Sequence, residues 1–515
     1  MIITLVMDQY GQVNNGTTVT TMRFAEVLRQ HGHEVRIVAY NPKGKDNNDD
    51  PYFYGVDCYK IPVFDGLVRS QGMIFAKPDD EVLMKAIKGS DVVHLLLPFP
   101  IQRRARLIAK ELGVATTAAF HCQPENITYT CFVGKVKKIN DILYNQFRKG
   151  FYQYINHIHC PSVMIRDQLV KHKYKANLHV ISNGVAPTFV PMEVEKPEEL
   201  KDKYVILMVG RLSREKRQDL LIKAIGTSKY NKNIQLILCG KGPWKKHLQK
   251  LSKKYLANPV KFEFLPQPEL LKVINYSDLY VHASDAEIEA ISCMEAFTCG
   301  LVPVISNSEL TATKQFAQDP HCLFEAGNYN SLREQIEYFY EHPEEKEALS
   351  KKYIEYAKQY ALDYCVTALE KVFEQEIKEN EERKKKGLNN QFTHKEIKKI
   401  KKIDKEVQKQ IEKEIKSNES PLKHMEADIM GFKEAQEDIL PVTLTYSFDS
   451  KDSAKQFQTE IAKNGLTSSY DDEDKIVDVI YHDGVNESDL KILSDTLVNA
   501  CTNASAEYKG FHFNK

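Results

Sequence analysis

The sequence predicts an α/β protein with two parallel sheets, each covered by helices, that face a shared cleft. Apolar segments of strand length alternate with helix-like segments, as in sheets that are buried on both faces. This alternation occurs in two separate series, which predicts two Rossmann-like domains. The 515 residues leave room for about three domains in total.

The first series occupies residues 1–185. An apolar run at residues 1–7 is followed by a polar loop at 8–18, a helix-like stretch at 19–30 and the strand-like EVRIVAY. The same order recurs in DVVHLLL, IQRRARLIAKELG and VATTAAF. These segments predict βαβ units of an N-terminal Rossmann-like domain.

The second series, residues 186–380, contains the strand-like YVILMVG, IQLILCG, KFEFL, DLYVHAS and VPVIS, with a helix around residues 219–225. In open α/β sheets, ligands bind outside the carboxyl ends of the strands. We therefore expect the ligand site in the cleft between the two domains.

The composition becomes charge-rich after residue 380. Residues 383–416 contain 13 Lys plus Arg and 5 Asp plus Glu, a local net charge of +8, with Ile or Val recurring every three or four residues. We interpret residues 381–438 as a charged helical linker. It is either a solvated or coiled-coil spacer or a helix that lies on anionic lipid or another polyanion.

Residues 439–515 have a pattern of their own, in which VTLTYSF, IVDVIYH and YKGFHF read as strands and residues 451–464 and 487–500 as helices. This order predicts a small α+β module of ferredoxin-like type. The SFDSKDSAKQFQTEIAKNG segment loosely resembles the ribonuclease E inhibitor B-like fold.

Composition excludes several classes of protein. The 71 basic residues balance the 71 acidic residues, which argues against a surface devoted to nucleic acid. No apolar run approaches the roughly 18 residues of a membrane span, and the opening segment lacks a basic signal region, so we expect a soluble chain. Ten scattered Cys without a C-x-x-C pair indicate reduced, cytosolic thiols, and His157–Cys160 lacks the partners of a metal site.

Two loops that follow strands carry residues suited to phosphate. Asn15 and Gly16 end a polar loop at a helix start, where backbone N–H groups can approach an anion, although an ordinary βα turn looks the same. In GRLSREK, Arg211 and Lys216 can grip a diphosphate from two sides, with a charged surface loop as the alternative.

Two further segments of the second series suit a sugar nucleotide. Gly240 and Gly242 in CGKGP allow close backbone approach to a ligand. Glu287 and Glu295, eight residues apart on a loop that enters a helix, can present carboxylates to sugar or ribose hydroxyls. Helix capping and packing are the alternative roles for these carboxylates.

Together these motifs make residues 1 to about 380 resemble the retaining GT-B glycosyltransferases of the large family four type. The motifs that carry the resemblance are the loop ending at Asn15-Gly16, His121, SNGV, GRLSREK, CGKGP, and the Glu287 and Glu295 pair followed by CGLVPV. The resemblance implies a GT-B fold, a nucleotide-sugar donor and no required cofactor or metal.

The resemblance also implies a role for each matching position. Gly16, with Asn15 beside it, would contact the distal phosphate, and Arg211 with Lys216 would hold the diphosphate. Glu295 would bind the ribose hydroxyls. The CGKGP glycines would complete the donor site.

Further roles concern the donor sugar. Glu287 and its neighbours Ala290 and Ile291 would contact the sugar, and His121 would lie over it near the reacting centre. The family commonly has Phe-Gly after the first glutamate, whereas this chain has Ile-Glu-Ala, which adds Glu289 as a further expected donor contact. This EIEAIS form and FHCQPEN resemble bacterial enzymes that glycosylate diacylglycerol.

A basic amphipathic stretch at residues 135–155 is a candidate acceptor or membrane surface. The residues expected to meet lipid are Lys135, Lys137, Lys138, Phe147, Arg148, Lys149 and Phe151. Its apolar face would enter the headgroup boundary while its cations meet anionic lipid. A core helix with a basic outer edge is the equal alternative.

The sequence thus predicts an enzyme that moves a hexose from a nucleotide sugar, UDP-linked in our interpretation, to diacylglycerol or a glycolipid. Retention would follow from same-face attack, with the departing diphosphate accepting the proton. We expect a cytoplasmic protein, peripheral on the inner face of the membrane, and no nucleic acid at the catalytic domains. The alternatives are the same chemistry on a polysaccharide, teichoic acid or other soluble acceptor, and a non-catalytic binding scaffold.

Overall fold

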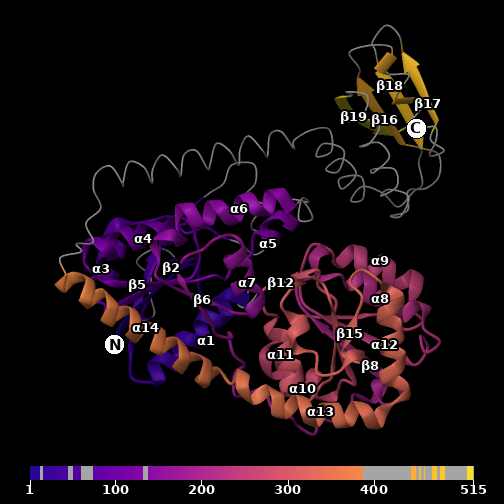
Figure 1. Cartoon of the computed structure of the whole chain (residues 1–515). Helices are drawn as coiled ribbons and strands as arrows, with labels where there is room; N and C mark the ends of the chain where they lie inside the picture. The colour runs from indigo at the N-terminus through magenta and orange to yellow at the C-terminus, as the bar shows by residue number, and fades with distance from the viewer. Residues whose placement is uncertain are drawn as a thin grey trace. The chain divides into compact units, whose positions relative to one another are not determined.

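The computed structural model describes residues 1–11, 16–43, 50–59, 74–130 and 137–386, and the strands and short helical pieces of a C-terminal sheet at 442–447, 452–453, 457–458, 467–471, 476–481 and 507–513. The chain divides into two compact units, Met1–Glu396 and Ile397–Lys515. The first unit contains two parallel sheets, which we call the sheets of the first and second domains (Figure 1).

The first domain is built on a seven-stranded parallel sheet of order β3-β2-β1-β4-β5-β6-β7. Its strands are β1 (Ile2–Gln9), β2 (Glu34–Tyr40), β3 (Phe53–Val56), β4 (Val92–Leu95), β5 (Ala115–Ala119), β6 (His157–Cys160) and β7 (Asn177–Val180). Its helices are α1 (Gly16–Gln30), α3 (Asp80–Ile87), α4 (Pro100–Glu111), α5 (Pro124–Thr130), α6 (Lys137–Gly150) and α7 (Val163–Lys171).

Strand β1 shows how the sheet is buried on both faces. Ile3 and Leu5 belong to a core cluster with α1, whereas Val6 belongs to a second cluster with α3, α4 and α6. Successive side chains of a strand point to opposite faces, so a strand covered on both sides must be apolar throughout. The continuous apolar run of the sequence therefore predicted this strand correctly.

The second domain has a six-stranded parallel sheet of order β10-β9-β8-β11-β13-β15. Its strands are β8 (Tyr204–Val209), β9 (Ile234–Cys239), β10 (Lys261–Glu263), β11 (Leu279–His282), β13 (Pro303–Ser306) and β15 (Leu323–Phe324), and β12 (Ala286–Glu287) pairs separately with β14 (Leu310–Thr311). Its helices are α8 (Gln218–Thr227), α9 (Lys245–Tyr255), α10 (Gln267–Tyr276), α11 (Ile291–Thr298), α12 (Tyr329–Glu341) and α13 (Pro343–Ala357). Two Rossmann-like sheets are thus confirmed.

Helix α14 (Leu362–Lys385) differs from the sequence-based division of the chain. Although it follows the second domain in sequence, its Leu369 and Phe373 are buried in the core cluster of β1 and α1. Figure 1 shows this helix running from the second domain along the first. The chain therefore passes between the domains twice, and the passages meet where Val185 pairs with Ala361.

The C-terminal unit contains a four-stranded antiparallel sheet of order β17-β18-β16-β19. Its strands are β16 (Val442–Ser447), β17 (Thr467–Asp471), β18 (Ile476–Tyr481) and β19 (Glu507–Phe513). This strand order agrees with the ferredoxin-like module expected from the sequence. The linker helix beyond residue 386 and most of the two helices expected in the module lie outside the described residues.

Two negative findings concern the described part of the chain. None of its cysteines forms a disulfide, in line with their scattered spacing. None of its helices has the length and apolar character needed to cross a membrane.

Candidate active site

The GRLSREK and CGKGP loops pack backbone against backbone at the carboxyl ends of β8 and β9. Leu212 N–H donates to the Lys241 carbonyl at 3.0 Å, and Trp244 N–H donates to the Leu212 carbonyl at 3.0 Å. A Cβ at Gly240 would lie 1.9 Å from the Gly210 oxygen, and one at Gly242 would lie 2.2 Å from the Leu212 oxygen. Both glycines are needed for this contact between loops, and their contact with a donor stays a prediction.

Lys216 and Glu287 form an ion pair at the centre of this region. Lys216 ends the short helix η3 (Arg214–Lys216), its Nζ donates to Glu287 Oε2, and both side chains are less than 20% exposed. His282 Nε2 at the end of β11 lies 3.6 Å from the same carboxylate. Although burial acts against it, Lys216 and His282 lower the pKa of Glu287 to about 2, so this carboxylate is ionised at neutral pH.

Arg211 is held by a neighbour that lies between the two predicted cations. Its Nη2 donates to Glu215 Oε1 at 2.7 Å, and Ser213 Oγ donates to the same oxygen at 2.6 Å. Burial opposes ionisation of Glu215, but Arg211 and Ser213 lower its pKa below the ordinary value. A guanidinium fixed by a buried carboxylate is oriented before a phosphate arrives, which reduces the entropy cost of binding.

An ion pair joins the two domains beside these loops. Arg23, on α1 of the first domain, donates from Nη2 to Glu295 Oε1 on α11 of the second domain at 2.8 Å. The side chains are only 13% and 9% exposed. Burial raises the pKa of Glu295 above its ordinary value, while Arg23 acts in the opposite direction. No sequence pattern pointed to Arg23, since a single arginine is common in an amphipathic helix.

Gly16 is exposed and forms the first residue of α1, so backbone N–H groups are available at this helix start. Asn15 lies outside the described residues. The helix begins earlier than the Val19 start predicted from the sequence. Since Arg23 on the same helix reaches Glu295, the structure brings α1 and α11 together across the domain boundary.

His121 follows β5 and is buried beside His159, whose ring centroid lies 5.2 Å away. Burial, together with His159 and His94, lowers the pKa of His121 well below its ordinary value, so its imidazole is neutral at pH 7. Its Nε2 has no hydrogen-bond partner in the structure. The adjoining helix α5 contacts η3 and β12, which places this loop beside the loops of Lys216 and Glu287.

Glu289 occupies a different place from the one expected of a donor contact. It is 2% exposed, and its Oε2 accepts a hydrogen bond from the Asn183 N–H at 2.9 Å, in the segment that joins the two domains. The expectation of a carboxylate presented to the donor is therefore corrected. Ala290 caps α11 in a left-handed conformation, with φ of 66°, and Ile291 begins that helix half-buried.

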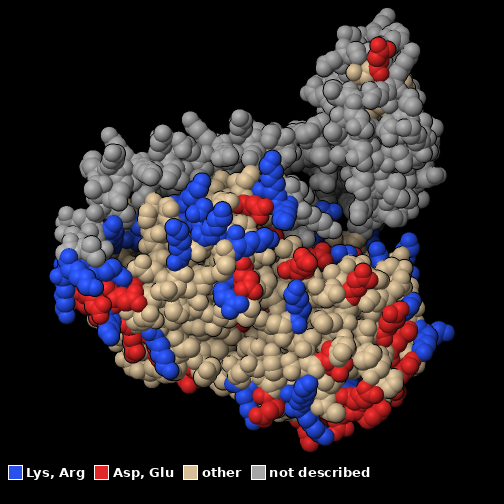
Figure 2. Space-filling view, in the orientation of Figure 1, with Lys and Arg blue, Asp and Glu red and all other residues tan. Residues whose placement is uncertain are grey.

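The membrane-facing part of α6 also needs correction. Phe147 is 6% exposed and Phe151 is 0% exposed, because both pack in the core of the first domain. They cannot enter a lipid headgroup layer, and the alternative of a core helix with a basic outer edge describes this apolar face better. The cations remain outside: Lys137, Lys138 and Lys149 are exposed. Figure 2 shows Lys and Arg gathered over α6 and α4.

Arg148, also assigned to this surface, is half-buried and donates to Asn145. Lys135 lies outside the described residues. A lipid contact by any of the cations of α6 stays a prediction.

One group in the described part of the chain has metal-binding geometry. Candidate ligand atoms of His157, Glu376 and Glu379 lie within 4.8 Å of one another. Arg383 already donates to Glu376 at 2.6 Å, which neutralises one of these carboxylates. His157 begins β6, so the group lies at the amino-terminal ends of the strands of the first sheet, whereas the donor loops follow the carboxyl ends of strands.

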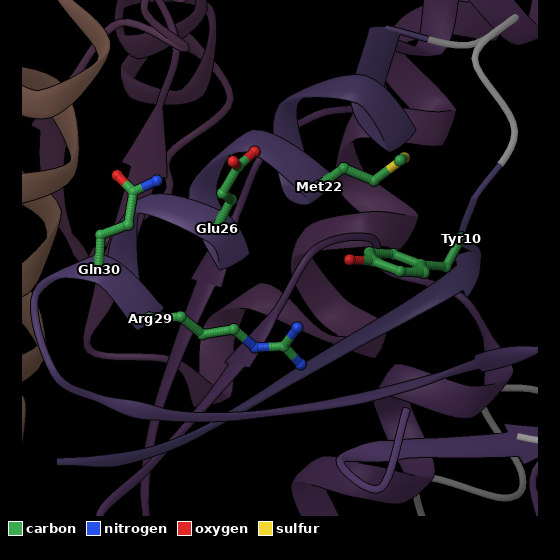
Figure 3. A pocket seen from close by; sticks show the side chains of 5 residues that line it. All are labelled: Tyr10, Met22, Glu26, Arg29 and Gln30. Carbon is green, nitrogen blue, oxygen red and sulfur yellow. The ribbon is translucent and has the colours of Figure 1, made fainter. Parts of the chain in front are cut away.

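Figure 3 shows a pocket of the first domain. It is lined by Met22, Glu26, Arg29 and Gln30 of α1 and by Tyr10, which follows β1. None of the residues assigned to donor or acceptor from the sequence lines it.

Both domains match known glycosyltransferase families. Residues 14–189 match Glycosyltransferase Family 4, and residues 191–360 match Glycosyl transferases group 1. Residues 14–360 thus form two glycosyltransferase domains in a GT-B fold. Their donor is accordingly a nucleotide sugar, and enzymes of this kind need no cofactor. These matches favour an enzyme over the non-catalytic scaffold considered from the sequence.

Curated relatives of this glycosyltransferase differ in their donors. The alpha-monoglucosyldiacylglycerol synthase of Streptococcus pneumoniae is 23% identical over 320 residues, 60% of this chain and 71% of the relative. The GDP-mannose-dependent alpha-mannosyltransferase of Corynebacterium glutamicum is 23% identical over 312 residues, 59% of this chain and 72% of the relative.

Solved structures support the fold. Sucrose-phosphate synthase of Thermosynechococcus elongatus has a TM-score of 0.57 at 15% identity, covering 72% of this chain and 98% of its own. HepE of Anabaena, in complex with UDP and glucose, has a TM-score of 0.55 at 15% identity, covering 73% and 99%.

Proposed function

We propose that this glycosyltransferase is a retaining enzyme that moves a hexose from a UDP-sugar to a membrane lipid such as diacylglycerol or a glycolipid. The observation that carries the lipid acceptor is the exposed cationic edge of α6, formed by Lys137, Lys138 and Lys149. Each cation near an anionic surface contributes about 1 kcal/mol to binding. The lipid-glycosylating relative of Streptococcus pneumoniae supports the same acceptor.

The chemistry proposed for the donor site uses the ion-paired cations. Lys216 would exchange Glu287 for the donor diphosphate, Arg211 would bind the diphosphate while Glu215 holds it in place, and both cations would stabilise the charge that develops as the diphosphate departs. Glu287 is already ion-paired with Lys216 in the free protein, and His282 Nε2 lies 3.6 Å from it, which disfavours a nucleophilic role for it. Same-face attack, with the departing diphosphate taking the acceptor proton, therefore suits this site.

A second donor has specific support. Two mannosyltransferases among the relatives are named as GDP-mannose-dependent, so GDP-mannose is the competing donor. A soluble acceptor is the competing acceptor. With a soluble acceptor, the cationic edge of α6 is an ordinary solvated surface.

The test is sugar transfer by the purified full-length protein with a panel of UDP- and GDP-sugars, with and without anionic vesicles that contain diacylglycerol. Vesicle-dependent transfer from a UDP-sugar supports the proposal, and transfer to soluble acceptors alone refutes it. Lys216→Ala should raise the barrier to transfer by roughly 3 kcal/mol, by analogy with a lost oxyanion donor.

A matched pair of triple variants tests the membrane surface. Replacing Lys137, Lys138 and Lys149 with Gln should weaken vesicle binding by roughly 100-fold, from about 1 kcal/mol per cation. The control replaces the exposed Lys246, Lys250 and Lys253 of α9 and should leave vesicle binding near that of the wild type. Equal losses of vesicle binding in the two variants would mean that binding depends on net charge and not on the surface of α6.

A further inference from the structure

The turn from Glu287 to Ala290 connects β12 to α11 and is contacted by the first domain at two successive residues. Ser162 Oγ donates to the Ile288 carbonyl at 2.7 Å, and the Ile288 side chain packs against the core of the first domain. The next residue, Glu289, accepts from the Asn183 N–H. The turn that carries Glu287 is therefore fixed from outside its own domain.

The environment of Glu289 is where the two passages between the domains run side by side. Val185 N–H donates to the Tyr360 carbonyl at 2.8 Å, and Leu362 N–H donates to the Val185 carbonyl at 3.0 Å. Asn183 precedes this point on the first passage. The hydrogen bond from Asn183 to Glu289 therefore links the donor turn to the place where the two connecting segments pair.

Glu289 has no compensating charge in the described part of the chain. Glu289 forms no ion pair there. Its titratable neighbours are the Tyr360 hydroxyl and the Cys365 thiol, and the Ser182 hydroxyl also interacts with it. Its Oε1 is buried without a hydrogen-bond partner, as is Asn183 Oδ1. A protonated carboxyl supplies a hydrogen to such a site, whereas a carboxylate adds a second unmet acceptor.

We propose that Glu289 is a positioning residue that works as a neutral carboxylic acid, tying the donor turn to the interdomain connection so that Glu287 and the start of α11 keep their place. This inference rests on the proposed donor site but not on the identity of the acceptor. Burial raises the pKa of Glu289 to about 8, so the neutral acid prevails at pH 7. Deprotonation places an unpaired charge at the junction and loosens the turn.

The sign of the stability effect follows from the same shift. Between the ordinary value of 4.5 and about 8, the folded state holds this proton more tightly than the unfolded state. The contribution of Glu289 to the free energy of unfolding therefore falls as the pH rises through this interval and is constant above it. Glu289→Gln keeps a carbonyl for the Asn183 N–H and an N–H donor in place of the acid proton, and it removes this dependence.

The experiment compares full-length wild type, Glu289→Gln, Glu289→Ala and Ser162→Ala from pH 6 to 9.5, with three readouts: melting temperature, UDP affinity by calorimetry, and kcat and KM for sugar transfer or donor hydrolysis. Wild-type kcat should fall about tenfold per pH unit above its apparent pKa. The Gln variant should keep the pH 7 activity, lose this alkaline limb and melt higher at pH 8.

The Ala variant should lose roughly 10- to 100-fold in kcat, since it leaves the Asn183 N–H unpaired, with UDP affinity retained. Ser162→Ala removes the neighbouring tie without a titratable group, so it should lower kcat and keep the wild-type alkaline limb. An unchanged alkaline limb in Glu289→Gln, or a Gln variant as impaired as the Ala variant, overturns the proposal. Melting temperature and UDP affinity are measured without an acceptor. They therefore distinguish failure of the Glu289 proposal from failure of the lipid-acceptor proposal.

Discussion

The ion pair between Arg23 and Glu295 gives a measurable link between the two domains. The charged atoms are 2.8 Å apart, and both side chains are largely buried. Charges about 4 Å apart attract by roughly 4 kcal/mol at an effective dielectric constant near 20, and removing one partner of a buried pair costs about 3–5 kcal/mol. We expect Arg23→Met to lower the free energy of unfolding by about 3 kcal/mol, because Glu295 is left buried without its cation.

A double-mutant cycle isolates the pair. Arg23→Met, Glu295→Gln and the double variant would be unfolded in urea and followed by the fluorescence of Trp244, the single tryptophan, and by circular dichroism. We expect a coupling energy of about 2 kcal/mol, since the double variant leaves neither charge unpaired. Additivity within about 0.5 kcal/mol would refute the assignment of an interdomain tie.

A matched control is available on the same helix. Arg29 pairs with Asp50 at 2.7 Å, but these side chains are 35% and 34% exposed. Arg29→Met should cost less than about 1 kcal/mol because solvent screens the pair. Equal losses at the two arginines would mean that burial of the interdomain pair contributes nothing.

Three further predictions concern single residues. Ala290 has φ of 66°, a left-handed conformation that is unfavourable for a residue with a Cβ but not for glycine. Ala290→Gly should therefore raise the free energy of unfolding by about 1 kcal/mol, and an unchanged melting temperature would contradict this. Gly240→Ala should destabilise by roughly 3 kcal/mol, since its Cβ would lie 1.9 Å from the Gly210 oxygen, and a neutral result in urea unfolding would show that the loops can separate freely. Burial raises the pKa of Asp8 to about 7 against the hydrogen bonds from Gln102 and Ala76, so its contribution to the free energy of unfolding should fall by roughly 3 kcal/mol from pH 4 to 7. Asp8→Asn should flatten this profile, and an unaltered profile would contradict the shift.

Several short strands of the first domain escaped prediction for a local reason. β6 reads HIHC and β7 reads NLHV, so neither has the continuous apolar character of β1. Their polar side chains are accommodated by partners that are distant in sequence, such as Ile181, whose carbonyl lies 2.7 Å from His159 Nε2. A sequence pattern reports local polarity and carries no information on these partners.

The amino-acid pattern was enough to identify the two series of buried strands, the glycines at the strand ends, and Arg211, Lys216, Glu287 and Glu295 as candidate site residues. These features are local, since a strand buried on both faces must be apolar and a loop that approaches another backbone must lack a Cβ. The two series predicted the Rossmann-like domains, and the resemblance carried by the motifs implied the GT-B fold and the glycosyltransferase family.

Tertiary packing sets which of these residues meet and which surfaces remain exposed. It turned Glu289 toward Asn183, buried Phe147 and Phe151, and carried α14 back onto the first domain. An amphipathic helix has the same periodicity whether its apolar face meets lipid or a protein core. The choice depends on the elements that pack against it, and that packing joins segments hundreds of residues apart.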